Sequence, residues 1–294
     1  MNDIKQLINI HAEKINKILK ELLEEEEIQL SETLVSSMRY SLLSGGKRLR
    51  PVLTTLVAEM INGDIENARR VGAAIEMIHT YSLIHDDLPS MDDDDYRRGK
   101  KTNHRVYGPG IAILAGDGLL TYSFSVLSKL SLPAEKKIKI IELISQCAGL
   151  QGMVGGQVLD LEGEEREIDL QEMQIIHRAK TGALFKASIL AGAYCGDISA
   201  REIDALEKYA ELLGLTFQIV DDILDVIGDE EKMGKQVGSD DKLNKSTYPK
   251  LLGLEESQKK ARENAIAAKN SLDIFGEKSY YLKKIIDFVV ERQT

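Results

Sequence analysis

Apolar residues recur along most of the chain at the three- and four-residue spacing that is typical of amphipathic helices. The spacing first holds over residues 3–27, and a second helix is expected from Ser31 toward Leu43, where Gly45-Gly46 would end it. Further helices are expected over residues 51–61, 67–86, 111–130, 134–162, 169–196, 199–228, 254–272 and 279–291. The alternation of apolar and polar residues that marks a strand persists nowhere, so the sequence predicts an all-α fold.

Two polar segments interrupt this helical pattern. Residues 97–110 are polar and contain glycine, which predicts a loop. Residues 229–248 are charged and punctuated by glycine, which predicts a mobile flap. The chain carries no convincing linker, low-complexity segment or short repeat. We therefore expect a single large domain over residues 1–294, although this length exceeds that of a typical domain.

Composition restricts the class of protein. Hydrophobic residues make up 43% of the 294 residues, which is enough for a large core, and the net charge of −10 disfavours a nucleic-acid partner. Cys147 and Cys195 stand in apolar stretches, where buried thiols in a reducing compartment are expected. The N-terminus has no signal-peptide pattern, and no uncharged apolar run is long enough for a membrane span. These features predict a cytoplasmic protein without a membrane span.

Two aspartate-rich clusters stand inside otherwise apolar helical sequence. The first is Asp86-Asp87-Leu88-Pro89-Ser90-Met91-Asp92, and the second is Asp221-Asp222-Ile223-Leu224-Asp225. Adjacent carboxylates raise each other's pKa unless a cation offsets their repulsion. Hard oxygen ligands suit Mg²⁺, which usually binds through one or two carboxylates together with substrate phosphates. The clusters therefore predict a site that holds a phosphate ester through Mg²⁺.

The spacing within each cluster indicates how its carboxylates are arranged. Asp221 and Asp225 are four residues apart, so a helix places them on one face. The alternative, a helix end with surface acids, is disfavoured by the apolar residues that interleave with them. Asp86 and Asp92 are six residues apart and would lie on different faces of an ideal helix. Pro89 is expected to break the helix, so that Asp92 returns toward Asp86.

Basic residues occur at two places near these acids. Gly45-Gly46-Lys47-Arg48-Leu49-Arg50 puts three cations beside flexible backbone but lacks the spacing of a P-loop. Arg97-Arg98 follows the first cluster, and the intervening residues 93–95, all aspartates, are expected to be solvated or paired with these arginines. A plain salt-bridge network would explain such a pair. Cationic forks beside a Mg²⁺ site instead favour diphosphate binding.

Other polar residues interrupt the apolar helices. His79 lies about two turns before Asp86 on the same helix face, although a lone histidine is often only a structural residue. Gly155-Gly156-Gln157 with Asp160, and Lys180-Thr181-Gly182, break further apolar stretches. Buried polar groups at these positions need partners or cost stability.

These motifs, in this order, resemble those of the trans-isoprenyl diphosphate synthases. The resemblance covers both aspartate clusters and roughly residues 40–250, and its other motifs are Gly45–Arg50, Arg97-Arg98, Gly156-Gln157, Lys180-Thr181-Gly182 and Gly234-Lys235. The four residues between Asp87 and Asp92 match the bacterial-type farnesyl or plant-type geranylgeranyl subgroups. The resemblance implies a helical bundle around a deep central cavity, a homodimer, and Mg²⁺-dependent condensation of isopentenyl diphosphate with dimethylallyl and geranyl diphosphate.

The resemblance also implies a role for each matching residue. Three Mg²⁺ ions are expected, two on Asp86 and Asp92 and one on Asp221, supported by Asp87, Asp160, Asp222 and Asp225. The allylic diphosphate would be bound by Arg97, Lys180 and Lys235, and isopentenyl diphosphate by Lys47, Arg50, His79 and Arg98. Thr181 and Gln218 would lie beside the developing carbocation. Lys245 of the flap and Arg292 of the tail are further candidates to close over the substrate.

Tyr81 and Ser82 are the candidate chain-length residues. Tyr81 lies five residues before Asp86, about 7.5 Å along a helix axis, so its ring could form the floor of the cavity that holds the growing chain. Alternatively, Tyr81 only packs in the core. A floor at this position favours farnesyl diphosphate (C15) over geranylgeranyl diphosphate, and geranyl diphosphate is a further alternative.

Two other classes of protein share part of this pattern. A terpene cyclase has the same need for metal but should not need the cations Lys47, Arg50 and Arg98. A non-catalytic helical subunit that modifies a partner synthase would be expected to lose one aspartate cluster, whereas this sequence has both.

Overall fold

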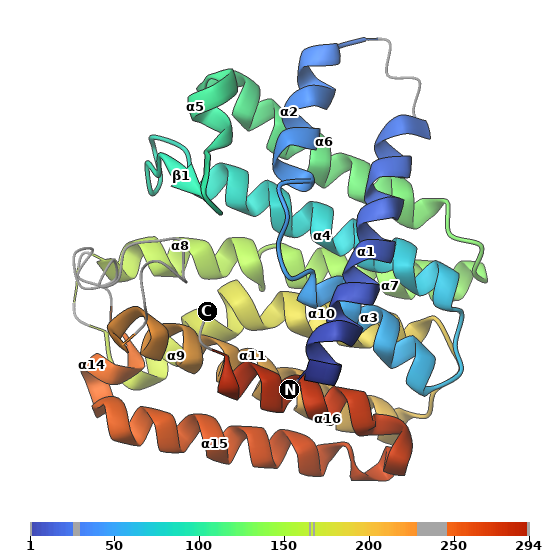
Figure 1. Cartoon of the computed structure of the whole chain (residues 1–294), viewed down its shortest axis with the longest axis vertical. Helices are drawn as coiled ribbons and strands as arrows, with labels where there is room; N and C mark the ends of the chain where they lie inside the picture. Colours follow the sequence, from blue (N-terminus) through green and yellow to red (C-terminus); the bar gives the residue numbers. More distant parts are fainter. Residues whose placement is uncertain (1, 26–29, 165, 167, 228–245, 293–294) are drawn as a thin grey trace.

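The structure, a computed structural model, describes residues 2–25, 30–164, 166, 168–227 and 246–292 (Figure 1). Its α-helices are α1 (Asn2–Glu25), α2 (Glu32–Leu42), α3 (Leu49–Met60), α4 (Ile65–Asp86), α5 (Asn103–Tyr107), α6 (Pro109–Ser128), α7 (Ala134–Ala148), α8 (Met153–Glu164), α9 (Leu170–His177), α10 (Ala183–Tyr194), α11 (Ala200–Ile227), α14 (Tyr248–Leu252), α15 (Leu254–Ser271) and α16 (Tyr280–Glu291). A π-helix, η1 (Arg178–Gly182), and a 3₁₀-helix, η2 (Asp273–Ser279), complete the helical elements of the described chain. The predicted all-α fold is confirmed.

Several helix boundaries agree closely with the prediction. The expected helices over residues 199–228, 254–272 and 279–291 are present as α11, α15 and α16. The expected helix over 169–196 is continuous, but its middle is the π-helix η1. Residues 229–245 of the flap predicted over 229–248 lie outside the described residues.

The prediction of one helix over residues 134–162 is wrong, because the chain turns between α7 and α8. The Gly149 amide donates to the Ser145 carbonyl (3.0 Å), and the Gly152 amide donates to the Gly149 carbonyl (3.1 Å). A Cβ on Gly152 would lie 1.9 Å from the Cys147 carbonyl oxygen, so only glycine fits this turn. Apolar periodicity continues on both sides of the turn and therefore does not reveal it.

The predicted loop over residues 97–110 also contains regular structure. The strands β1 (Tyr96–Arg97) and β2 (Lys100–Lys101) pair antiparallel, and the short helix α5 follows. Two polar contacts hold this segment to α2: Ser37 Oγ donates to Asn103 Oδ1 in the interior (2.8 Å), and Tyr40 OH donates to the Lys101 carbonyl at the surface (2.7 Å). These long-range contacts have no signature in the local sequence pattern.

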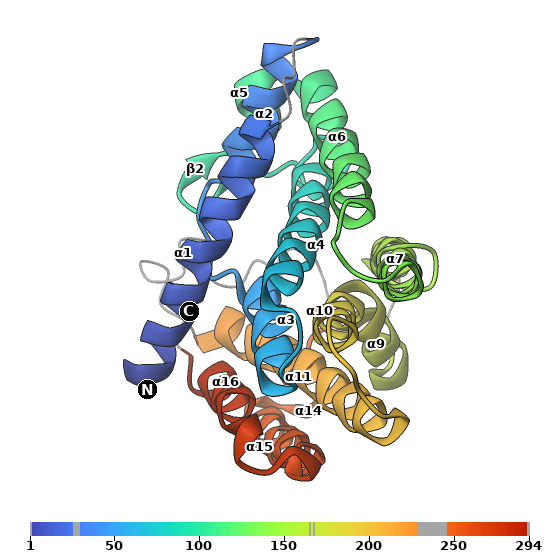
Figure 2. The same ribbon diagram turned by 90° about the vertical axis from the view of Figure 1, so that its right-hand side faces the viewer.

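Helix α4 lies at the centre of the bundle, where it packs against α3, α6 and α10 (Figure 2). One buried cluster around α4 and α6 includes Met77 and Leu119. A second cluster joins α3, α10, α11 and α16, and includes Leu53, Phe185 and Tyr209. Because α10 packs on α4 and on α11, it fixes the separation of the two helices that carry the aspartate clusters.

Among the described helices, α6 alone is long and apolar enough to cross a membrane by length and composition. One such helix is weak evidence for a span, since a core helix meets the same criterion. Here α6 packs against α4 and α2.

Candidate active site

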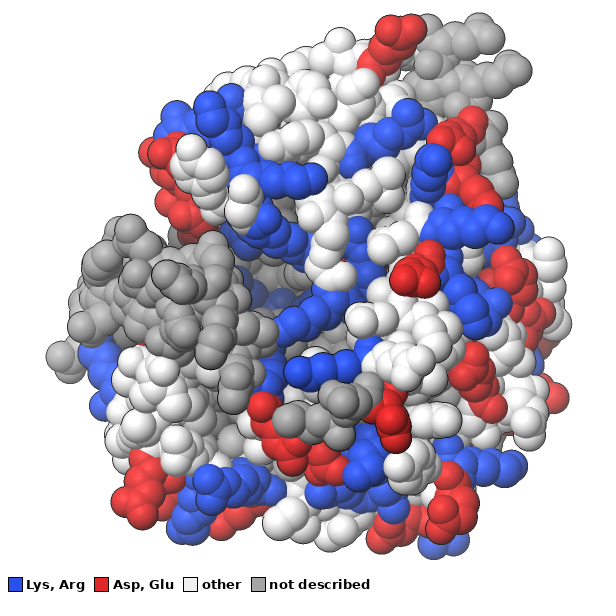
Figure 3. All heavy atoms as spheres, viewed as in Figure 1, with Lys and Arg blue, Asp and Glu red and all other residues white. Residues whose placement is uncertain are grey.

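Both aspartate clusters face a single cavity of about 860 Å³. Asp86 comes from the end of α4, whereas Asp221 and Asp222 come from α11. Lys and Arg side chains gather around the hollow on the face shown in Figure 3. The expected site residues that line the cavity are Arg50, His79, Tyr81, Ser82, Asp86, Arg97, Arg98, Asp160, Lys180, Thr181, Gln218, Asp221 and Asp222.

Some expected site residues are placed elsewhere. Asp87, Asp92, Asp225 and Lys47 are not among the residues that line the cavity, and Asp87 and Asp225 are buried. Lys235 and Lys245 lie outside the described residues. The buried Asp87 and Asp225 can therefore act on a ligand through their neighbours, whereas Asp92 is exposed.

The first cluster has the helix break that Pro89 predicted. Helix α4 ends at Asp86, and the Leu88 amide donates to the His85 carbonyl (3.2 Å). The Asp92 amide then donates to the Asp86 carbonyl (2.9 Å), so the chain returns to the end of α4. The predicted approach of Asp92 to Asp86 is confirmed.

Asp87 orients Arg97. Oδ1 of the buried Asp87 carboxylate accepts from Arg97 at both Nε (2.7 Å) and NH2 (2.6 Å), and these two charge-assisted contacts hold the guanidinium in place. Burial raises the pKa of Asp87, while the hydrogen bond from Arg97 opposes that effect. Arg97 lines the cavity, so Asp87 supports a cation at the wall.

Two of the three aspartates at residues 93–95 pair with Arg105, which was not predicted from the sequence. Asp94 lies 3.8 Å from Arg97, as expected. Asp93 pairs with Arg105 (3.4 Å), and Asp95 also pairs with Arg105. Arg98, expected as a partner, instead donates to the Gly45 carbonyl.

In the second cluster, Asp221 and Asp222 have different surroundings. Asp221 is half-exposed and pairs with Arg292 NH2 (2.7 Å). Asp222 is buried and accepts hydrogen bonds from Gln218 Nε2 (3.0 Å) and from the Tyr248 amide (2.9 Å). The contact with Tyr248 was not predicted, because it depends on the return of the chain at α14.

Arg292 is held against α11 from the end of the chain. Its NH2 group also donates to the Phe217 carbonyl (2.9 Å), and its guanidinium lies 3.9 Å from the centroid of the Phe217 ring. These contacts place the expected tail residue beside Asp221.

The π-helix η1 carries Lys180 and Thr181 to the cavity. Lys180 Nζ pairs with Asp160 Oδ2 (2.6 Å), and Thr181 Oγ1 donates to Gln218 Oε1 (3.1 Å). Two glycines allow neighbouring helices to approach η1: a Cβ on Gly156 would lie 2.3 Å from the Lys180 nitrogen, and one on Gly214 would lie 2.9 Å from the Gly182 Cα. Single-turn π segments occur frequently at functional sites.

Arg50, His79 and Arg98 contribute cationic and polar groups to the cavity wall. Burial lowers the pKa of Arg50 to about 10, so Arg50 stays protonated near neutral pH. Within the described chain, Arg50 Nε is buried without a hydrogen-bond partner. Burial, followed by the charge of Arg50, holds the pKa of His79 well below its usual value, so His79 is neutral. An unsatisfied guanidinium donor in a cavity wall suits an anionic ligand.

Tyr81 and Ser82 both line the cavity one turn above Asp86. The Tyr81 ring is buried and lies edge-on to His85, with ring centroids 5.6 Å apart. His85 in turn contacts the Ile113 carbonyl through Nε2 (3.0 Å) and rests on Gly116, where a Cβ would come within 2.2 Å. The ring at the predicted floor is therefore held by a neighbour.

The family to which the chain belongs follows from comparison with known proteins. The polyprenyl synthetase family model matches residues 31–280. Farnesyl diphosphate synthase of Geobacillus stearothermophilus is 44% identical over 289 residues, which cover 96% of this chain and 97% of the relative. Geranylgeranyl diphosphate synthase of Cyanophora paradoxa is 45% identical over 262 residues, 88% of this chain and 87% of the relative.

A solved structure agrees with these sequence matches. An FPP/GFPP synthase from Zymomonas mobilis superposes with a TM-score of 0.88 at 37% identity, covering 98% of this chain and 99% of the other. The chain belongs to the polyprenyl synthetase family. It is a prenyltransferase.

Mg²⁺ dependence is a property of this family. Among the described residues, no three His, Cys, Asp or Glu side chains are close enough together to hold a metal ion by themselves. Asp86, Asp221 and Asp160 nevertheless offer hard oxygen donors at one cavity, which suit Mg²⁺ when phosphate oxygens complete its coordination. Burial raises the pKa of Asp86 to about 6, and a bound cation would favour the carboxylate form.

The substitution Asp86→Asn should change how stability depends on pH in metal-free buffer. The folded state binds the Asp86 proton more tightly than the unfolded state, because the pKa rises from 3.8 to about 6. The stability that protonated Asp86 contributes is complete below its usual pKa of 3.8 and is lost as pH rises through about 6. The Tm gain of the variant over wild type should therefore be largest near about pH 8 and shrink toward about pH 5.

Asp94→Asn provides the matched control, since it removes an exposed carboxylate from the same segment. Thermal unfolding followed by circular dichroism across this pH range measures both variants. A Tm difference for Asp86→Asn that does not vary with pH would contradict the raised pKa.

Proposed function

We propose that this protein condenses isopentenyl diphosphate head-to-tail with dimethylallyl and then geranyl diphosphate, giving farnesyl diphosphate and diphosphate. The observation that carries the proposal is the single cavity, whose walls bring together carboxylates of both clusters, Arg50, Arg97, Lys180 and Tyr81. The Geobacillus relative bears the name of this activity. The reaction would take place in the cytoplasm, where the buried Cys147 and Cys195 would remain free thiols.

The carboxylates would hold three Mg²⁺ ions with the allylic diphosphate, two through Asp86 and Asp92 and one through Asp221. Bound Mg²⁺ would screen the negative charge that grows on the leaving diphosphate. Asp160 and Asp222 support this arrangement, because Asp160 pairs with Lys180 (2.6 Å) and Asp222 fixes Gln218 (3.0 Å). Asp87 and Asp225 would contribute from behind the wall.

The cations would divide between the two substrates. Arg97 and Lys180, with Lys235, would bind the allylic diphosphate, whose C–O bond breaks. Arg50, His79 and Arg98, with Lys47, would bind isopentenyl diphosphate. Fixed cations that meet charge as it develops are usually the largest catalytic contribution. The proposal therefore requires no nucleophilic side chain.

Thr181 and Gln218 would stabilise the allylic carbocation. Gln218 Nε2 donates to Asp222, and Gln218 Oε1 accepts from Thr181, so the orientation of the amide is fixed from both ends. Oxygen atoms with lone pairs at the cavity wall favour an adjacent positive charge. The double bond of isopentenyl diphosphate attacks the cation, and the departed diphosphate accepts the proton that is lost. A closed site would protect the cation from water.

Incubation of the purified protein with Mg²⁺, isopentenyl diphosphate and geranyl diphosphate should release diphosphate and yield a C15 product on chromatography. Asp221→Asn should lower kcat by about a hundredfold or more, since it removes a metal ligand. A chelator should abolish the wild-type activity. Absence of diphosphate release from the wild-type protein would leave only a non-catalytic role. Cyclic hydrocarbon products would identify a terpene cyclase.

The main alternative product is geranylgeranyl diphosphate, because the Cyanophora relative carries that name. The ring of Tyr81, as the floor of the cavity, would decide between farnesyl and geranylgeranyl diphosphate. Geranyl diphosphate would be the sole product only if condensation stopped at C10. Tyr81→Ala should lengthen the product beyond C15, since it removes the ring proposed as the floor of the cavity, which His85 holds in place. Tyr81→Phe keeps the ring and should keep the C15 product. An unchanged product length in Tyr81→Ala would show that this ring is not the floor.

We further propose that the protein forms a homodimer. Exposed apolar side chains lie on α6, on α7, in the turn after α7 and at the start of α8: Ile113, Leu114, Ile138, Leu150 and Val154. Large apolar side chains exposed on neighbouring helices are candidates for a protein contact. Light scattering should give twice the chain mass of 32.7 kDa, and Leu114→Glu should shift the mass toward one chain. A wild-type mass of one chain would refute the dimer.

A further inference from the structure

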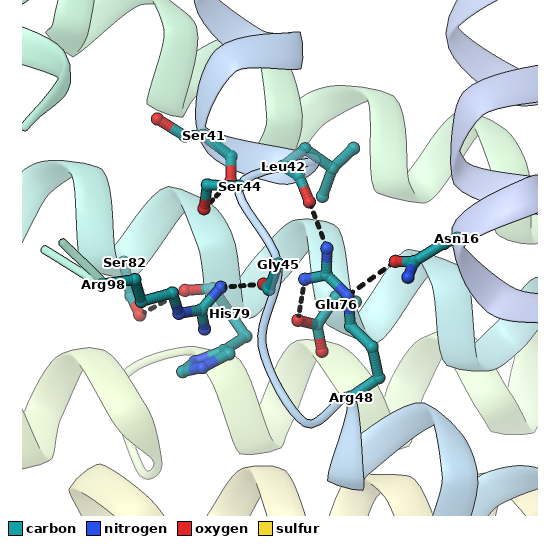
Figure 4. A network of polar contacts seen from close by, with 10 residues as sticks. All are labelled: Asn16, Ser41, Leu42, Ser44, Gly45, Arg48, Glu76, His79, Ser82 and Arg98. Carbon is teal, nitrogen blue, oxygen red and sulfur yellow. Dashed lines mark hydrogen bonds and ion pairs between the residues drawn. The ribbon is translucent and has the colours of Figure 1, made fainter. Parts of the chain in front are cut away.

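Arg48 stands between Lys47 and Arg50 in the sequence, but its side chain does not reach the cavity. Its side chain is fully buried, with a relative exposure of 0%, and Arg48 is not among the residues that line the cavity. Figure 4 shows its guanidinium facing Glu76, Asn16 and the Leu42 carbonyl, on the other side of the loop from His79 and Arg98. Sequence reasoning assigned no role to this residue.

Three hydrogen bonds fix the Arg48 guanidinium to three other helices. NH1 pairs with Glu76 Oε1 of α4 (2.6 Å), and NH2 donates to the Leu42 carbonyl at the end of α2 (2.6 Å). Nε donates to Asn16 Oδ1 of α1 (2.9 Å). One side chain thus sets where the start of α3 lies relative to α1, α2 and α4. A lysine could not make these contacts, because it lacks the planar fork of donors.

The backbone of Arg48 is left-handed, with φ +49° and ψ +33°, and it is the residue immediately before α3. Residues other than glycine, asparagine and aspartate rarely adopt this conformation. Such a conformation persists only where the surroundings enforce it. The turn at Arg48 sends Arg50 into α3 and toward the cavity, while Arg48 itself faces the core.

Arg98 holds the same loop from the cavity side. It donates to the Gly45 carbonyl, and its guanidinium lies so close to Gly46 that a Cβ there would come within 2.8 Å. Gly46 also has φ +120°, a backbone conformation that favours glycine. Arg48 and Arg98 therefore enclose the segment that carries Lys47.

Glu76 connects this pair to the cavity wall. It lies three residues before His79 on α4, one turn away on the same side of the helix. Burial lowers the pKa of Arg50 and of Arg98, and the negative charge of Glu76 is the largest opposing influence on both. A buried carboxylate behind two cations stabilises their charged forms.

We infer that Arg48 and Glu76 are a positioning pair that arranges Arg50, His79, Arg98 and the Gly45–Lys47 segment for isopentenyl diphosphate. The inference rests on the proposed function. The cations for the allylic diphosphate lie elsewhere: Arg97 is held by Asp87, and Lys180 is held by Asp160. Loss of the Arg48–Glu76 pair should therefore weaken the binding of one substrate and not of the other.

The competing explanation is that the pair only stabilises the bundle. Breaking a buried ion pair by removing one partner leaves an uncompensated charge and is strongly destabilising. Removing both charges avoids that cost and is often neutral. The double variant Arg48→Met/Glu76→Gln thus separates the two roles, since it should fold while losing the contacts to Leu42 and Asn16.

Steady-state kinetics of Arg48→Lys, Glu76→Gln and the double variant test the inference. KM for isopentenyl diphosphate should rise about tenfold or more, whereas KM for geranyl diphosphate and kcat should stay within about twofold of wild type. The matched control is Lys269→Met/Asp287→Asn, which removes an ion pair (2.7 Å) between α15 and α16, away from the cavity. This control should change neither KM.

The outcomes distinguish the inference from the proposed function. An inactive wild-type protein refutes the proposed function itself. An active wild type with a folded double variant in which both KM values rise together, or neither rises, refutes the positioning role. If Arg48→Lys and Glu76→Gln unfold, the double variant decides the question, and unfolding of all three supports the purely structural explanation.

Discussion

Ion pairs that join different elements around one cavity are the interaction on which the rest of this structure depends. Asp87 binds Arg97, Asp160 binds Lys180, and Asp221 binds Arg292, each at a distance of 2.6 or 2.7 Å. A partly buried charge without a partner is costly, so these pairs allow the walls to hold many charges while the chain remains folded. The bundle supplies the framework, because α10 packs on both of the helices that carry aspartates of the two clusters, α4 and α11.

The same ion pairs hold the charges of the site in place before the substrate binds. A diphosphate with its divalent ions offers each member of a pair a new partner: phosphate oxygens for the cation and metal for the carboxylate. Charges that are already in place need little reorganisation when the allylic bond breaks, which is the physical basis of electrostatic catalysis. The half-buried Asp86, whose pKa burial raises to about 6, would be held in its carboxylate form by a bound cation.

Backbone geometry provides the second requirement, because charges are useful only where the chain can present them. The π-helix η1 turns Lys180 and Thr181 toward the cavity, and Gly156 and Gly214 let α8 and α11 close around it. Before α3, the backbone of Arg48 is left-handed. The Arg48 side chain faces the core, whereas the Arg50 side chain faces the cavity. Both devices place cations by changing the backbone locally.

The sequence by itself determined the helical class, most helix boundaries, the break at Pro89 and the identity of the charged residues, because these depend on local periodicity and residue chemistry. It did not reveal the turn between α7 and α8, the hairpin within residues 97–110, or the π-helix within residues 169–196, since tight glycine turns and distant contacts decide them. Only the tertiary structure showed that Asp87 pairs with Arg97, that Asp222 accepts a hydrogen bond from Gln218, and that Arg48 pairs with Glu76. Pairing between residues far apart in the chain has no signature in one sequence, because it arises when packed helices bring their side chains together.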